Sequence, residues 1–123
     1  MTQNFIILFD LDGTLIDTAP DLMNAHNHVM KKFGYESRST NEIRNLVGKG
    51  AESMIGRSMW NQAKKELKKI DDEEIKSQMV KEFIDYYGKN IANESKLIKG
   101  VNKFLFVLED QLLNVLFCWC IQP

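Results

Sequence analysis

Several features that would point to particular classes of protein are missing from this 123-residue sequence. There is no excess of basic residues, because 16 lysines and arginines face 17 acidic residues, so nucleic acid is not expected as a partner. No apolar run approaches the roughly 18 residues that cross a membrane, and no membrane association is expected. Asp10 and Asp12 interrupt the apolar run near the start, so no signal peptide is expected and the cytoplasm is the expected location.

Cysteine and histidine are scarce as well, with two of each. Cys118 and Cys120 form a C-x-C pair with no second pair, which argues against a structural zinc site. On one strand they would be poorly placed for a disulfide, so we expect small buried apolar side chains. His26 and His28 have no Cys or His at metal-ligand spacing, and we expect partly exposed residues on a helix.

The most informative segment lies near the N-terminus. An apolar run at 5–9 predicts a buried strand of a parallel sheet, and Asp10-Leu11-Asp12-Gly13-Thr14 follows it. Two carboxylates at the end of a buried strand are costly to place there without a task. A nucleophilic Asp, a second Asp as acid/base and a hard cation between them would make a phosphoryl-transfer site. The alternative is an Asx turn after a strand, which explains Asp12-Gly13 but not Asp10.

Downstream of this loop the sequence predicts mainly helices. Apolar residues at helical spacing give expected helices near residues 20–33, 39–46, 51–59, 62–70, 72–87 and 101–110. Gly34 is suited to end the first helix, and Ser39 with Glu42 forms a capping-box pattern that opens the second. Asp71 or Asp72 is expected to cap the fifth helix. Residues 112–120 then predict a second strand.

The stretch FDLDGTLIDT, Phe9 to Thr18, resembles the first signature motif of the haloacid dehalogenase superfamily of phosphatases. The resemblance implies that Asp10 is the nucleophile, forms an aspartyl-phosphate and ligates Mg²⁺. It implies that Asp12 is the acid/base, with its backbone carbonyl on the same Mg²⁺. Thr14 would position Asp12 and the backbone near the phosphate.

The resemblance also implies an α/β fold class, with a partial Rossmann-like core and an inserted all-helical cap. The chain would then divide into the first strand and catalytic loop at 1–16, the helical cap at 17–95, and the return to the core at 96–123. Most of this chain would be α-helical. The resemblance extends over about residues 4–110.

A second stretch, Arg44 to Gly50, resembles the RxxVGxG segment in the caps of phosphoglycolate phosphatases. Its glycines leave backbone N–H groups open at the start of the next helix, which favours an anion. Arg44 could pair bidentately with a carboxylate, and Lys49 adds a point charge. The alternative is a glycine hinge between two helices with a surface Arg. The substrate-binding residues expected from the two motifs are Thr14, Arg44, Gly48, Lys49 and Gly50.

These residues suit a small anionic phosphomonoester, and the best candidate is 2-phosphoglycolate, hydrolysed to glycolate. The superfamily's later motifs are a Ser or Thr, a Lys and an acidic pair, and no Ser or Thr follows Ser95. We therefore expect a C-terminally truncated chain that is inactive alone. Two alternatives stay open: a non-catalytic binding remnant, and a related phosphatase for a sugar phosphate or a phosphonate aldehyde. The oligomeric state is not predicted.

Overall fold

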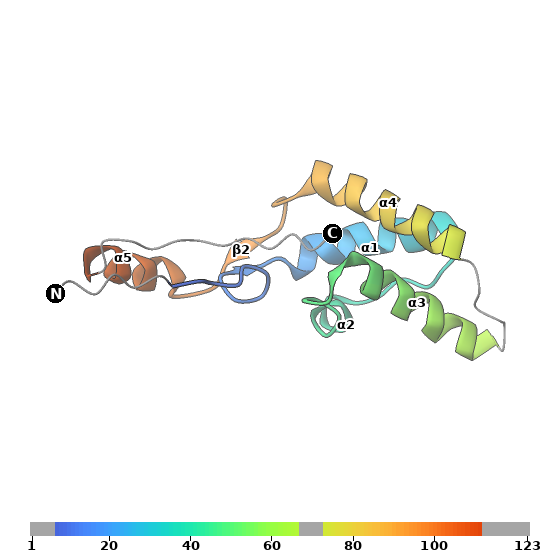
Figure 1. Ribbon diagram of the computed structural model, residues 1–123, viewed down its shortest axis with the longest axis horizontal. Helices are drawn as coiled ribbons and strands as arrows, with labels where there is room; N and C mark the ends of the chain where they lie inside the picture. The colour runs from blue at the N-terminus through green and yellow to red at the C-terminus, as the bar shows by residue number, and fades with distance from the viewer. Residues whose placement is uncertain (1–6, 67–72, 112–123) are drawn as a thin grey trace.

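The computed structural model describes residues 7–66 and 73–111. In chain order its elements are β1 (Ile16–Asp17), α1 (Ala19–Phe33), α2 (Thr40–Arg44), α3 (Gly50–Glu66), α4 (Glu73–Asn90), β2 (Lys96–Leu97) and α5 (Val101–Gln111). Helices α1 to α4 form a bundle at one end of an elongated molecule, and α5 lies at the other end (Figure 1). The two short strands lie between them, where the chain enters and leaves the bundle (Figure 1).

The local helix signals are confirmed where the structure describes them. Helix α1 ends at Gly34, which has a φ of 77° and donates its N–H to the helix's last carbonyls. A residue with a side chain would be strained in this left-handed conformation, so glycine is the natural stop. At the start of α2, Ser39 accepts from the backbone N–H of Glu42, whose carboxylate accepts from the Ser39 N–H at 2.8 Å. This is the predicted capping box.

Helix α3 differs from the prediction of two helices with a break near residue 60. It runs unbroken from Gly50 to Glu66. No glycine or proline interrupts the segment after Gly56, and Ser58 and Met59 are buried. Continuing a helix adds one hydrogen bond per residue, whereas a new helix must form a costly first turn. The predicted caps Asp71 and Asp72 lie outside the described residues.

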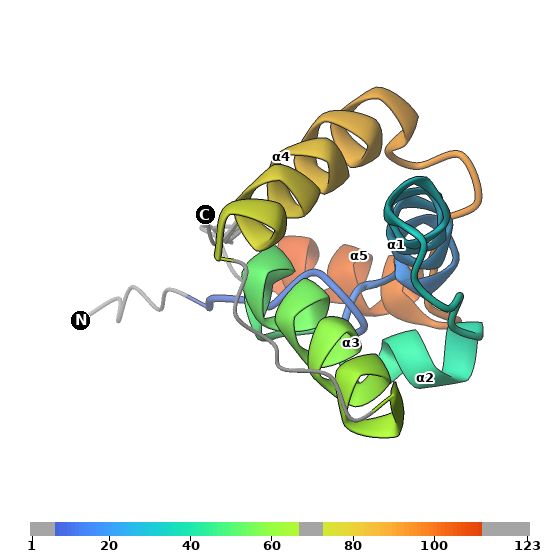
Figure 2. The same ribbon diagram turned by 90° about the vertical axis from the view of Figure 1, so that its right-hand side faces the viewer.

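The core of the bundle is apolar and is supplied by all four helices. Helix α1 packs against α2 and α4, and α3 packs against α4; Figure 2 shows the bundle end-on. The largest fully buried side chains are those of His26, Val29, Met30, Ile43, Ile55 and Met79. The expectation for His26 is therefore wrong. The helices enclose its ring, and the cost of burying this polar group is offset by the hydrogen bond between Nε2 and the hydroxyl of Ser58 on α3, 2.8 Å apart.

Strands β1 and β2 are antiparallel, with Ile16 opposite Leu97 and Asp17 opposite Lys96. The predicted parallel strand at 5–9 is wrong for residues 7–9, which form no ladder. A strand needs a neighbour to receive its backbone hydrogen bonds, and the ladder that the structure describes joins only β1 and β2. Residues 5–6 and the predicted strand at 112–120 lie outside the described residues. None of the helices within 7–66 and 73–111 is long and apolar enough to span a bilayer.

Candidate active site

The loop that follows Asp10 is closed by its own backbone. The N–H groups of Thr14, Leu15 and Ile16 all donate to the carbonyl of Leu11, at 3.2, 3.0 and 3.1 Å. The N–H of Gly13 donates to the carbonyl of Ile16 at 2.7 Å, and the φ of Gly13 is 77°. The tight reversal needs this positive φ, which explains the glycine. These hydrogen bonds define the path of the backbone that carries the two carboxylates.

The two predicted catalytic carboxylates belong to this loop. Asp10 is exposed, and Asp12 is partly buried. The hydroxyl of Thr14 donates to a carboxylate oxygen of Asp10 over 3.4 Å, a long hydrogen bond. Thr14 therefore lies beside the predicted nucleophile, whereas the sequence led us to expect it beside Asp12. The exposure of Asp10 leaves its carboxylate accessible to a ligand.

The loop offers oxygen donors of the kind that Mg²⁺ prefers. Mg²⁺ is commonly held by one or two carboxylates together with water and substrate phosphate, so Asp10 and Asp12 fit this ion. Among residues 7–66 and 73–111, no third acidic or histidine side chain joins them in a cluster that could hold a metal. The described residues thus supply a partial set of ligands.

Arg44 lies at the end of α2 and has a partner within the chain. Its guanidinium pairs with both carboxylate oxygens of Asp17 on β1, at 2.5 and 2.8 Å. The hydrogen bond and the charge of Arg44 hold the pKa of Asp17 below its usual value. Side-chain exposure is 46% for Arg44 and 31% for Asp17. A substrate carboxylate would therefore have to replace that of Asp17, or share the guanidinium with it.

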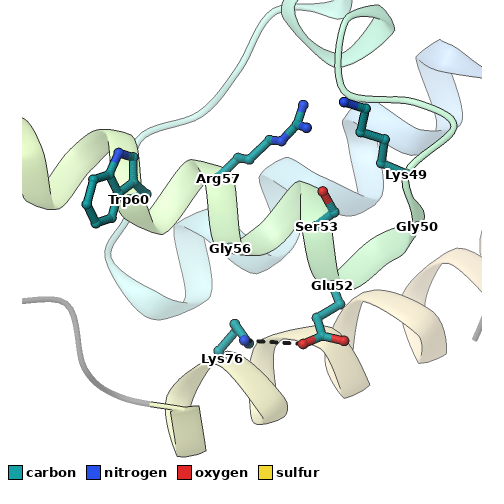
Figure 3. A pocket seen from close by; sticks show the side chains of 8 residues that line it. All are labelled: Lys49, Gly50, Glu52, Ser53, Gly56, Arg57, Trp60 and Lys76. Atoms are coloured by element: carbon teal, nitrogen blue, oxygen red, sulfur yellow. Dashed lines mark ion pairs between the residues drawn. The ribbon is translucent and has the colours of Figure 1, made fainter.

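The glycine-rich segment connects α2 to α3. Gly48 and Gly50 have φ values of 90° and 79°, and Lys49 between them is exposed. Figure 1 places the start of α3 at the end of the bundle that is nearer the catalytic loop. Lys49 and Gly50 line a groove along α3 (Figure 3). The predicted anion-binding residues are thus together at one end of the cap, with Arg44 tied to β1.

One buried carboxylate was missed by the sequence analysis. Asp21, in the first turn of α1, accepts from the backbone N–H groups of Glu94 and Ser95 and from the Ser95 hydroxyl. These bonds join the entrance of the bundle to its exit. Nothing local marks Asp21, since its partners are 73 and 74 residues away and an acid in the first turn of a helix is common.

A second missed residue is Tyr87, near the end of α4. Burial and the negative charges of Asp12 and Asp21 raise the pKa of Tyr87 to about 12. Its ring also stacks on Phe83, with 5.9 Å between the ring centroids.

A DxDGT loop beneath a helical cap defines a class of phosphoryl-transfer hydrolase. The chain matches the haloacid dehalogenase-like hydrolase family over residues 7–115, and it belongs to this family. The predicted family and its partial α/β fold class are thereby confirmed.

Among its relatives are several named phosphoglycolate phosphatases. The chain is 34% identical over 111 residues to the phosphoglycolate phosphatase of Haemophilus influenzae, and 35% identical over 112 residues to that of Pasteurella multocida. These alignments cover 89% and 90% of this chain but 49% of each relative. The chain therefore spans about half the length of the curated relatives it matches.

Solved structures show the same likeness. The crystal structure of a predicted phosphoglycolate phosphatase from Haemophilus somnus has a TM-score of 0.82 at 31% identity, covering 97% of this chain and 52% of that one. A putative phosphoglycolate phosphatase from Lactobacillus delbrueckii has a TM-score of 0.80 at 20% identity, covering 97% of this chain and 55% of that one. The second likeness shows the fold alone.

Proposed function

We propose that this chain carries the nucleophile, the acid/base and the cap of a Mg²⁺-dependent phosphatase that hydrolyses 2-phosphoglycolate to glycolate and phosphate. The observation that carries the proposal is the DxDGT loop itself, with an exposed Asp10 and a partly buried Asp12. The start of α3, where we expect an anion to bind, lies at the end of the bundle nearer this loop (Figure 1). The named relatives support the substrate.

In the proposed reaction, a carboxylate oxygen of Asp10 attacks phosphorus and the bond from phosphorus to the glycolate oxygen breaks. Asp12 gives its proton to the leaving alkoxide, so that glycolate departs neutral at that oxygen. Water then attacks the aspartyl-phosphate, Asp12 takes back a proton, and phosphate leaves with Asp10 restored. Mg²⁺ bound at Asp10 and at the carbonyl of Asp12 would supply positive charge to the transferring phosphoryl group.

The cap would recognise the carboxylate at the other end of the substrate. Open N–H groups at Gly48 and Gly50 and the charge of Lys49 favour an anion at the start of α3. Arg44 would join them by giving up one of its two bonds to Asp17. A planar guanidinium suits this exchange, because it presents several donors in one plane.

A second candidate is a non-catalytic anion-binding role for this chain. It is favoured by one observation: in the described residues, no third acidic or histidine ligand joins Asp10 and Asp12. Without a complete metal site and its charge, phosphoryl transfer loses the electrostatic stabilisation that usually contributes most.

One assay separates the two candidates: release of phosphate from 2-phosphoglycolate by the 123-residue chain, with and without Mg²⁺. Release that requires Mg²⁺ and is abolished by Asp10→Asn supports the phosphatase. Saturable binding without release supports the second candidate. Release that Asp10→Asn leaves unchanged contradicts the proposed mechanism.

A further inference from the structure

A groove of about 510 Å³ runs along α3 and past the first turn of α4. Polar and charged side chains of both helices line it, together with Trp60, which is 61% exposed (Figure 3). Lys49 at the start of α3 was predicted to bind an anion. The other side chains of the groove have no role in the mechanism above.

The charges on the two sides of this groove differ. On the α4 side, the ammonium of Lys76 lies 3.2 Å from Glu52 and 2.8 Å from Glu73, and these hydrogen bonds raise the pKa of Lys76. The single charge of Lys76 is therefore already paired, and the two carboxylates leave this side with a net negative charge. On the other side, neither Lys49 nor Arg57 forms an ion pair or a side-chain hydrogen bond with any described residue.

Three polar side chains gather on that second side. Ser53 and Arg57 are four residues apart, which places them on one face of α3, and Lys49 directly precedes this helix. Figure 3 shows the Lys49 and Arg57 side chains extending to the same side of α3, with the Ser53 hydroxyl between their stems, while Lys76 points away toward Glu52. A planar guanidinium, an ammonium and a hydroxyl are together the donors that recognise a phosphate or a carboxylate.

We propose that Lys49, Ser53 and Arg57 form an oxyanion-binding site on the face of α3. Two cations that form no ion pair with a described residue attract an anion.

The oxyanion has two possible sources, the non-reacting carboxylate of the substrate or free phosphate. Only the first source rests on the proposed function. The ligands to compare are therefore glycolate, inorganic phosphate and 2-phosphoglycolate, each at constant ionic strength. Tighter binding of glycolate, which has a carboxylate and no phosphate, assigns the site to the substrate carboxylate, and tighter binding of inorganic phosphate assigns it to phosphate.

The test is a nuclear magnetic resonance titration of the 123-residue chain labelled with ¹⁵N. We expect saturable shifts of the backbone amides of Ser53 and Arg57 and of the Trp60 indole. Arg57→Gln and Lys49→Gln should each weaken binding at least about tenfold, because each removes a charged donor. Lys31→Gln is the matched control, since this exposed lysine of α1 lies outside the groove. Arg57→Lys should bind at an intermediate strength if Arg57→Gln perturbs folding.

Two results would overturn the site: shifts that survive Arg57→Gln, or equal weakening by Lys31→Gln, which would indicate only general charge attraction. A solvated helix face gives no saturation at any of these residues, and that result also overturns it. Asp10→Asn distinguishes this proposal from the proposed function. It should abolish turnover and leave the α3 shifts intact, whereas loss of these shifts in Asp10→Asn would place the anion at the catalytic loop.

Discussion

The carboxylate of Asp21 is expected to hold the base of the cap closed, and Asp21→Ala tests this directly. Asp21 is 4% exposed and receives three donors: the Glu94 N–H at 2.9 Å, the Ser95 N–H at 2.8 Å and the Ser95 hydroxyl at 2.5 Å. The alanine variant leaves all three without their acceptor. These donors belong to the segment that leads from α4 into β2, so the lost hydrogen bonds would destabilise the region where β1 and β2 pair.

The magnitude follows from the number of donors and their access to water. A hydrogen bond to a charged group contributes about 1.5–3 kcal/mol. Glu94 is exposed, so water can replace the acceptor of its N–H, whereas the two donors of Ser95 are less accessible. Counting those two and allowing for partial hydration, we expect Asp21→Ala to lower the free energy of unfolding by about 2–4 kcal/mol.

The assay is urea unfolding followed by the circular dichroism of the helices, with amide hydrogen exchange at Glu94 and Ser95. Both amides should exchange faster in Asp21→Ala than in the parent chain, while amides of α3 change less. Asp85→Ala is the control, because the ion pair of Asp85 with Lys89 is exposed and its loss should cost at most about 0.5 kcal/mol. A loss below about 1 kcal/mol in Asp21→Ala, with unchanged exchange at Ser95, would refute the reasoning.

Three further predictions concern ionisation. Burial lowers the pKa of His26 below 6.5, so as the pH falls the unfolded chain binds a proton at this residue before the folded chain does, and the free energy of unfolding should decrease below about pH 6.5. In urea unfolding, His26→Gln should show a weaker decrease with pH, and an equal decrease would contradict this prediction. The hydrogen bonds from Ser39 and Arg38 lower the pKa of Glu42 to about 2, so the capping box should persist as the pH falls below 4.5 and be lost near pH 2. A titration of the Glu42 carboxyl resonance should show a higher pKa in Ser39→Ala. The pKa of Tyr87 should be about 12 in an ultraviolet titration, and Asp12→Asn should lower this pKa by removing a negative charge. An unchanged pKa would mean that the charge of Asp12 does not act on Tyr87.

The sequence predicted those parts of the structure that depend on near neighbours. The end of α1 at Gly34 and the capping box of Ser39 and Glu42 each involve residues at most a few positions apart, and both were found as expected. The continuity of α3 was missed, because charged residues in its second half suggested a separate helix while the burial of Met59 depends on tertiary packing.

Contacts between distant residues were the part that the sequence could not supply. His26 is buried because Ser58, 32 positions away, accepts or donates a hydrogen bond to its ring. Arg44 was expected to pair with a substrate carboxylate, and in the structure it pairs with the carboxylate of Asp17 in the same chain. In both cases the sequence indicated which kinds of bond the side chain can form, but the partner depends on the tertiary fold.

The links at the base of the cap differ in strength, and this difference bears on how the cap could recognise a substrate. The bonds of Asp21 are buried, and the β1–β2 ladder joins the same two segments, so opening either exposes unpaired polar groups. The pair between Arg44 and Asp17 is close to half exposed, and an exposed ion pair contributes only about 0–1 kcal/mol. A substrate carboxylate that takes over Arg44 therefore displaces little stability, since it replaces one carboxylate by another. The segment from Arg44 to Gly50 can then adjust to its ligand while Asp21 keeps the base of the cap, and with it the catalytic loop, in place.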